Sequence, residues 1–177
     1  MQAVSHLLEG RVDNFTSHQI PKMCDKDLYR QTTLYLSSDD DIADNNGAES
    51  LKGFKIQLGE PLKLDESKWL CGLVEIQIPQ QAGTLHSVLY VCCNICSGSL
   101  VNNRKLPILR ALLIGSAVSR KIKNVKYHVY NFPHIVYVPI RQQELQDISL
   151  YITDSAGNDV SFEKGTIHCA LHIRQQH

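Results

Sequence analysis

Hydrophobic and polar residues alternate in short runs along most of the chain, and this period predicts β-strands with one buried face. The clearest alternation lies near the C-terminus, in residues 148–153 and again in residues 167–173. A dense cluster of turn-forming residues at 154–159 separates the two runs, and Val160 and Phe162 resume the alternation before Gly165 interrupts it. A chain that ends on so regular a strand is expected to hold it inside a sheet, because a free edge there would promote unwanted pairing.

Similar runs precede this region, so the sequence predicts about eight strands and no long amphipathic helix. The segment 106–114 suits a strand or a helix, and Pro107 together with the flanking strand patterns favours a strand. The sequence predicts that strands are interrupted at residues 59–61 and end at Pro79. This pattern is typical of an all-β sandwich or barrel, and the long connections favour a single jelly-roll β-sandwich of antiparallel strands. The other predicted strands are residues 28–36, residues 54–58 with their continuation at 62–64, and residues 69–78, 87–96 and 126–140.

The domain organisation follows from where the alternation begins. Residues 1–27 are mixed and aperiodic, and Pro21 breaks any regular element, so they are predicted to form an N-terminal arm with a short helix near residues 4–8. Such an arm is expected to become ordered against a partner. Residues 28–177 are predicted to form one domain, with a polar loop at residues 37–47.

Composition narrows the functional classes. The 177 residues are 43% hydrophobic, enough for one substantial core, and 18 basic residues balance 18 acidic ones. A protein that binds a nucleic-acid backbone normally has a basic excess, so no direct nucleic-acid contact is expected. No run approaches the roughly 20 apolar residues of a membrane span, and the N-terminus lacks a signal-peptide pattern. We therefore expect a reducing compartment and free thiols.

Three groups of residues resemble metal ligands, and each has a simpler explanation. Cys93 and Cys96 form a C-x-x-C motif, but a zinc site needs four ligands, and on a continuous strand Cys92 and Cys96 would share one face while Cys93 takes the other. Core-filling thiols are the favoured interpretation. His168 and His172 share a strand face but lie apart along it. A run of aspartates is interpreted as a solvated loop because it lacks the spacing of a calcium site; the run comprises Asp39, Asp40, Asp41 and Asp44.

No arrangement of nucleophile, base and acid appears at a recognisable spacing, and no phosphate-binding loop is present in the sequence. The residues therefore predict a protein that is not an enzyme and uses no cofactor.

Two separated phrases resemble the minor capsid (penton) proteins of Polinton/Maverick elements and adintovirus-like viruses. Residues 54–79 are similar to that family's L-x-x-P-L-x-L followed by W-x-V-G-L-x-E-I-x-x-P, with Cys71 where a β-branched residue is more usual. The matched positions are Pro61, Leu62, Leu64, Trp69, Gly72, Leu73, Glu75, Ile76 and Pro79.

The second phrase, residues 139–174, resembles the closing segment of the same family. Its matched positions are Pro139, Ile148, Ile152, Asp154, Gly157, Val160, Phe162, Gly165, Leu171, His172 and Arg174. The resemblance extends over about residues 28–174, although residues 85–113 match nothing in the family pattern. It implies a single jelly roll that forms homopentamers at icosahedral vertices, among double-jelly-roll major capsid proteins. The location so implied is the virion capsid, assembled inside the host cell.

Three residues are candidates for the contact between subunits: Glu75, Arg174 and Trp69. If Val74 and Ile76 face the core, Glu75 faces outward and is available to an arginine of a neighbour. Trp69, the only tryptophan, suits a core anchor or an interface plug, and the core is favoured. The arm would reach a cement or internal capsid protein, so its deletion is expected to spare the fold and weaken capsid incorporation. The alternative function is a jelly-roll binding module, lectin-like or trimeric cytokine-like.

Overall fold

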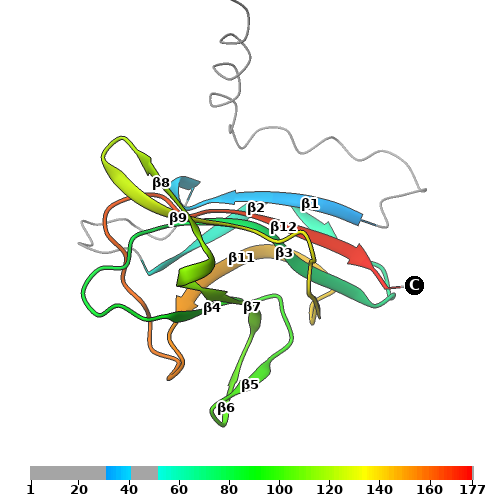
Figure 1. Cartoon of the computed structure of the whole chain (residues 1–177). Coiled ribbons are helices and arrows are strands. Elements are labelled where there is room, and N and C mark those ends of the chain that lie inside the picture. The colour runs from blue at the N-terminus through cyan, green and yellow to red at the C-terminus, as the bar shows by residue number, and fades with distance from the viewer. Residues whose placement is uncertain (1–30, 41–51, 177) are drawn as a thin grey trace, which may run out of the picture.

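The computed structural model describes residues 31–40 and 52–176, and in these residues the protein is all-β (Figure 1). Two antiparallel sheets carry the fold, and the regular helical structure among the described residues consists of two short 3-10 turns, η1 (Ser38–Asp40) and η2 (Ile114–Ser116). The predicted arm at residues 1–27 and the greater part of the polar loop lie outside the described residues.

The first sheet runs in the order β1 (Gln31–Ser37), β12 (His168–Gln175), β3 (Trp69–Pro79), β9 (Val125–Asn131) and β8 (Val118–Ile122), and β10 (Tyr137–Pro139) also pairs with β3. The second sheet has the order β2 (Gly53–Lys63), β11 (Glu144–Thr153), β4 (Val88–Cys93) and β7 (Ile108–Leu113). A separate hairpin joins β5 (Ser99–Val101) to β6 (Arg104–Leu106).

The two sheets bury their apolar faces in one shared core, an arrangement consistent with a β-sandwich. The predicted C-terminal strand is confirmed, and β12 lies between β1 and β3 rather than at an edge. The alternating side chains of β12 face the core from the first sheet, and those of β11 face it from the second. The central core residues include Cys169, Leu171 and Ile173 from β12, and Leu145, Ile148, Leu150 and Ile152 from β11.

Strand β3 changes face in its middle, which corrects one expectation. The outward position of Glu75 was argued on the condition that Val74 and Ile76 face the core, but Val74 is only half-buried, because the register against β12 shifts there and leaves Val74 as an extra residue in a β-bulge. Leu73 and Ile76, on either side, are fully buried. Glu75 is exposed, as predicted.

The break predicted at residues 59–61 does not end a strand. β2 continues through Pro61 to Lys63, and the irregularity appears as a register shift between Leu145 and Asp147 of its partner β11. Proline is tolerated here because β2 is the edge of its sheet, where a missing N–H leaves no ladder bond unmade. The segment 106–114, predicted as a strand, contains β7.

Val160 and Phe162, which resume the alternation in the sequence, are both buried but form no regular strand. They lie in a connection that makes only isolated bridges, one of them between Gln81 and Phe162. Two hairpins were not anticipated at all, β5–β6 and β8–β9. Their turns contain Asn102 with Asn103, and Lys123 with Asn124, all at positive φ, the conformation of two-residue hairpin turns.

Candidate functional site

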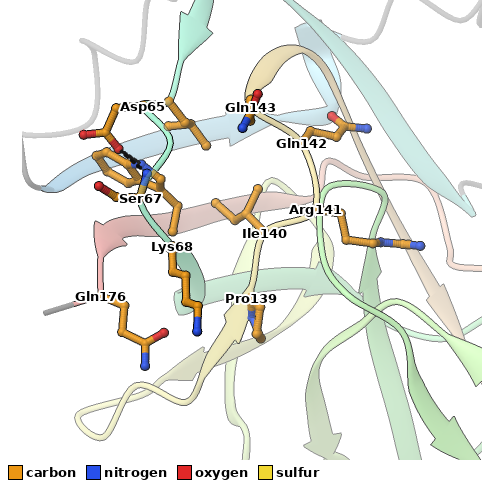
Figure 2. Close-up of a pocket in the computed structure, with 11 residues that line it drawn as sticks. Asp65, Ser67, Lys68, Pro139, Ile140, Arg141, Gln142, Gln143 and Gln176 are labelled. Atoms are coloured by element: carbon orange, nitrogen blue, oxygen red, sulfur yellow. Dashed lines mark hydrogen bonds between the residues drawn. The ribbon is translucent and has the colours of Figure 1, made fainter.

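An open pocket of about 440 Å³ lies at the end of the sandwich where β3 begins and β12 ends (Figure 2). We call it the Trp69 pocket. Its walls come from the β2–β3 connection, the segment after β10 and the C-terminal residues. The lining residues are Leu64, Asp65, Ser67, Lys68, Trp69, Pro139, Ile140, Arg141, Gln142, Gln143 and Gln176.

Backbone hydrogen bonds hold the walls of the Trp69 pocket together. The Ile140 N–H donates to the Trp69 carbonyl at 2.8 Å, and the Gln176 N–H donates to the Lys68 carbonyl at 2.7 Å. The Trp69 indole N–H donates to Asp65 Oδ1 at 2.8 Å, which orients the ring. This hydrogen bond, followed by bonds from Ser67, lowers the pKa of Asp65.

Trp69 takes the favoured core position, and its role at an interface stays a prediction. It packs against the core while remaining partly exposed in the pocket. An indole, the Ile140 side chain and several glutamine amides give the pocket apolar surface beside hydrogen-bonding groups. Such a surface can bind a polar ligand that carries an apolar face, or a side chain from another protein.

A second cluster, Tyr137, His172 and Arg174, lies on the outer face of the first sheet. The Tyr137 hydroxyl is 2.8 Å from His172 Nδ1, and the Arg174 guanidinium carbon lies 3.9 Å from the centre of the Tyr137 ring. We call it the outer-face cluster. Arg174 thus has a cation–π partner within its own chain. Its expected contact with a neighbouring subunit stays a prediction.

Gly72 lets the outer-face cluster form. It pairs with Tyr137 on one side and with His172 on the other. A Cβ atom at this position would overlap Ile135 Cγ2 and lie 3.0 Å from the Val136 carbonyl oxygen. The glycine is therefore required by the close approach of residues 135–137 to β3.

Acid is expected to weaken the fold through His172 and His128. Burial and, second, Arg174 lower the pKa of His172, while burial and then Lys126 lower the pKa of His128. The unfolded chain binds these protons at about pH 6.5, whereas the folded chain resists them. The contribution of the two histidines to the free energy of unfolding should therefore be fully present above about pH 6.5. It should decrease as the pH falls through that value toward the lowered pKa values of the folded chain. Denaturant melts of wild type and His172→Gln/His128→Gln between about pH 7.5 and pH 5.5 test this, and an equally steep loss in the variant would contradict it.

Glu75 lies on the outer face of the first sheet, paired with Ala170 and Asn131, and its role in a contact stays a prediction. His168 and His172 are both half-buried on the outer side of β12. The three predicted contact residues lie at separate places: Trp69 lines the pocket, Arg174 belongs to the outer-face cluster, and Glu75 pairs with neither group.

The expectation that Cys93 faces away from Cys96 is wrong. β4 ends at Cys93, and the chain turns, with the Cys96 N–H donating to the Cys93 carbonyl at 3.1 Å. The turn brings the Cys96 thiol close to the thiols of Cys71 and Cys93, so β3 of one sheet meets the end of β4 of the other.

All five described cysteines are buried and free, as predicted for core-filling thiols. Contact with Cys96, followed by burial, raises the pKa of Cys93 well above its ordinary value, and burial raises the pKa of Cys92 to about 11. These thiols stay protonated at neutral pH and are poor nucleophiles. Across residues 31–40 and 52–176, no three His, Cys, Asp or Glu side chains form a group that could hold a metal ion. Asp39, from the predicted acidic loop, accepts a hydrogen bond of 2.9 Å from Thr166 Oγ1.

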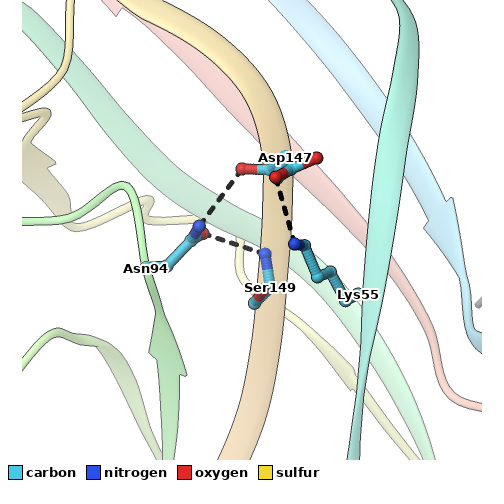
Figure 3. A network of polar contacts seen from close by, with 4 residues as sticks. All are labelled: Lys55, Asn94, Asp147 and Ser149. Atoms are coloured by element: carbon cyan, nitrogen blue, oxygen red, sulfur yellow. Dashed lines mark hydrogen bonds and ion pairs between the residues drawn. The ribbon is translucent and has the colours of Figure 1, made fainter. Parts of the chain in front are cut away.

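Asn94 joins this turn to β11 (Figure 3). Its Nδ2 donates to the Asp147 carbonyl at 3.1 Å, and its Oδ1 accepts from the Ser149 N–H at 2.9 Å. The side chain thus extends the β4–β11 ladder beyond the point where β4 ends. Nearby, Lys55 Nζ lies 3.0 Å from Asp147 Oδ2, with both side chains about two-fifths exposed to solvent.

Asn94→Ala is expected to reduce the free energy of unfolding by about 1–3 kcal/mol, because it leaves two part-buried backbone groups without their partners. Lys55→Met removes an ion pair that is exposed to solvent and is expected to cost less than about 1 kcal/mol. Urea denaturation of both variants measures the difference. Equal losses would mean that the Asn94 amide does not hold the turn.

The part of the chain that the structure describes contains no helix long and apolar enough to cross a membrane. No family model matches the sequence, and no curated protein matches it either.

Proposed function

We propose that this chain is a structural capsid subunit: a penton protein that forms homopentamers at the fivefold vertices of an icosahedral virion, as in the family that its sequence resembles. Its proposed partners are further copies of itself and a double-jelly-roll major capsid protein. The N-terminal arm would contact a cement or internal capsid protein. The role is structural rather than catalytic.

The observation that carries this proposal is the nested pairing of eight strands. β1 pairs with β12, β2 with β11, β3 with β9, and β4 with β7. A jelly roll, in which one long hairpin folds over into two sheets with two Greek keys, is expected to give nested pairs of this kind. We therefore propose a single jelly roll, an architecture used by viral capsid subunits among other proteins.

The two phrases that carry the family resemblance support the same reading of the fold. The first covers β2 and β3, and the second covers β11 and β12. β2 pairs with β11, and β3 pairs with β12, so the phrases encode strands that hydrogen-bond to each other in both sheets. The resemblance thus rests on four strands that contribute side chains to the shared core of the sandwich.

The second candidate function is a binding module, and the Trp69 pocket is the observation that favours it. An indole beside amide side chains suits a carbohydrate or a peptide segment. In this case the protein would be lectin-like or would form trimers, and Trp69→Ala would abolish ligand binding without changing the oligomeric state.

The mass of the full chain in solution tests the proposal. Size-exclusion chromatography with light scattering should give five times the 20.0 kDa of one chain, and negative-stain class averages should show fivefold rings. Trimers, or a monomer that binds a glycan array through Trp69, would favour the binding module. A fivefold ring that Trp69→Ala leaves intact would remove the pocket from the assembly contact.

Glu75→Ala tests the predicted contact residue. Because Glu75 is exposed and makes no ion pair with another described residue, the substitution should leave the melting temperature within about 2 °C of wild type. If Glu75 binds an arginine of the neighbour, the ring should dissociate at concentrations where the wild-type ring persists. Rings of unchanged stability would exclude that pairing.

A further inference from the structure

We infer that the ring contact joins two opposite edges of the first sheet: the β8 edge of one copy and the β1 edge of the next copy. This inference rests on the proposed ring and specifies its contact surfaces. A ring of identical subunits needs two different, complementary surfaces on each copy, because every contact is head-to-tail. The two edges of one sheet can supply that pair.

The β8 edge lacks cover in the described part of the molecule. All five residues of β8 are exposed, so neither of its faces packs against the sandwich. Val118 is 59% exposed and Ile122 is 44% exposed. β8 hydrogen-bonds to β9 alone among the described strands, and the β8–β9 hairpin extends past the body of the two sheets (Figure 1). β8 therefore gains little from packing within its own chain, and a partner surface along its free edge would stabilise it.

The charges on the two edges are opposite. Residues 118–126 contain four exposed basic side chains and no acidic one, and none of the four forms an ion pair with a described residue. The β1 edge contains no basic residue from Gln31 to Asp40 and ends with Asp39 and Asp40. Asp39 is exposed. The basic residues are Arg120, Lys121, Lys123 and Lys126.

The two charged groups also lie at the same end of the sheet. Ser37, the last residue of β1, pairs with His168, the first residue of β12. At that end of the neighbouring strand β3, Pro79 pairs with Tyr127, close to the turn of the β8–β9 hairpin. In a ring whose axis is parallel to the strands, the basic residues of one copy and the acidic residues of the next copy would therefore lie at the same level along the axis.

The direction of the strands completes the geometry. Each of the four neighbouring pairs from β1 to β8 is antiparallel, so β1 and β8 point in the same direction. In a ring with its axis along the strands, β8 of one copy and β1 of the next would lie side by side and parallel. Tyr35 on β1 is 65% exposed, and Val118 and Ile122 on β8 give the same contact apolar surface.

Charge exchange tests the contact in the full chain. Arg120→Glu/Lys121→Glu makes the β8 edge acidic, like the β1 edge that it would meet. Asp39→Lys/Asp40→Lys makes the β1 edge basic, like the β8 edge. Each double variant is expected to raise the dissociation constant of the ring at least about 100-fold, because like charges that meet at an interface cost several kcal/mol. The chain carrying all four substitutions restores opposite charges and should form rings again. Lys63→Glu/Lys105→Glu, at two exposed positions on other strands, is the matched control and should assemble like wild type.

The readouts are light scattering and native mass spectrometry over a range of concentrations and salt, with circular dichroism melts to verify folding. Loss of rings in both double variants, recovery in the fourfold variant, and weaker assembly in high salt support the inference. Wild-type rings together with intact rings in both double variants overturn the edge contact and leave the capsid proposal standing. A wild-type chain that forms no ring at any concentration overturns the contact and the self-assembled pentamer together.

Discussion

Gly72→Ala is expected to reduce the free energy of unfolding by about 2–4 kcal/mol, although it adds a single methyl group. Gly72 lies in the middle of the first sheet, between Tyr137 of β10 and His172 of β12. The new Cβ would overlap Ile135 Cγ2, lie 3.0 Å from the Val136 carbonyl oxygen, and lie 3.1 Å from Tyr137 Cδ1. The carbonyl belongs to the backbone, so rotation of a side chain cannot relieve that contact.

The structure offers one way to accommodate the added methyl group, which is to move β10 off β3. That movement would break the pairing of residues 137–139 with residues 70–72 and separate the Tyr137 hydroxyl from His172. Urea denaturation should therefore show the loss of stability, and the tyrosine fluorescence of the native state should show the altered surroundings of Tyr137. Gly59→Ala is the matched control. No atom lies within 4 Å of a Cβ built at Gly59, so the change should be neutral or stabilise by up to about 1 kcal/mol. Equal stability of the two variants would mean that residues 135–137 do not rest on β3.

The sequence predicted most of the strands because a strand with one buried face alternates in hydrophobicity. β3 and β12 are the clearest cases, and each was placed to within one or two residues at its ends. β8 was missed for the same reason: all its residues are exposed, so there is no alternation to detect. The one signal in the sequence for the β8–β9 hairpin was the asparagine at position 124, because asparagine tolerates the positive φ of a two-residue turn. In the structure, Lys123 and Asn124 both have positive φ.

The errors in the sequence interpretation come from places where strands stop being regular. A strand continued through Cys96 would have separated Cys93 from Cys96, but the turn at Asn94 brings the two thiols together. Strict alternation would place Val74 on the same face as Ile76, in the core, but a one-residue bulge leaves Val74 only half-buried. A bulge or a turn of this kind depends on tertiary packing, which the local pattern does not contain.

The candidate sites depend on pairing between distant strands. Tyr137 and His172 are 35 residues apart and meet because β10 and β12 lie on the two sides of Gly72. The Trp69 pocket needs the β2–β3 connection, the segment after β10 and the C-terminal residues at one end of the sandwich. The sequence identified Trp69, Gly72, His172 and Arg174 as notable positions through the family resemblance. The register that brings His172 and Arg174 to Tyr137 is a property of the folded sheet.

The second large effect is expected at Phe162, which lies outside the regular strands but is fully buried. Its backbone is fixed next to residues 80–82: the Ala82 N–H donates to the Ser161 carbonyl at 2.9 Å, and the Glu163 N–H donates to the Gln80 carbonyl at 2.8 Å. Gln81 lies opposite Phe162, and its own side chain is held by two hydrogen bonds to the backbone of His86. The connection between β11 and β12 thus inserts an aromatic ring into the core shared by the two sheets.

Phe162→Ala is therefore expected to reduce the free energy of unfolding by about 3–5 kcal/mol, because the ring leaves a cavity that the fixed backbone cannot close. Phe162→Leu fills part of the space and should recover more than half of that loss. Leu85→Ala is the control, since Leu85 is also apolar and outside the strands but is 71% exposed, and its removal should cost less than about 0.5 kcal/mol. Urea denaturation of the three variants gives the ranking. If Phe162→Ala were no more harmful than Leu85→Ala, the β11–β12 connection would be a surface loop, and the core would be formed by the strands alone.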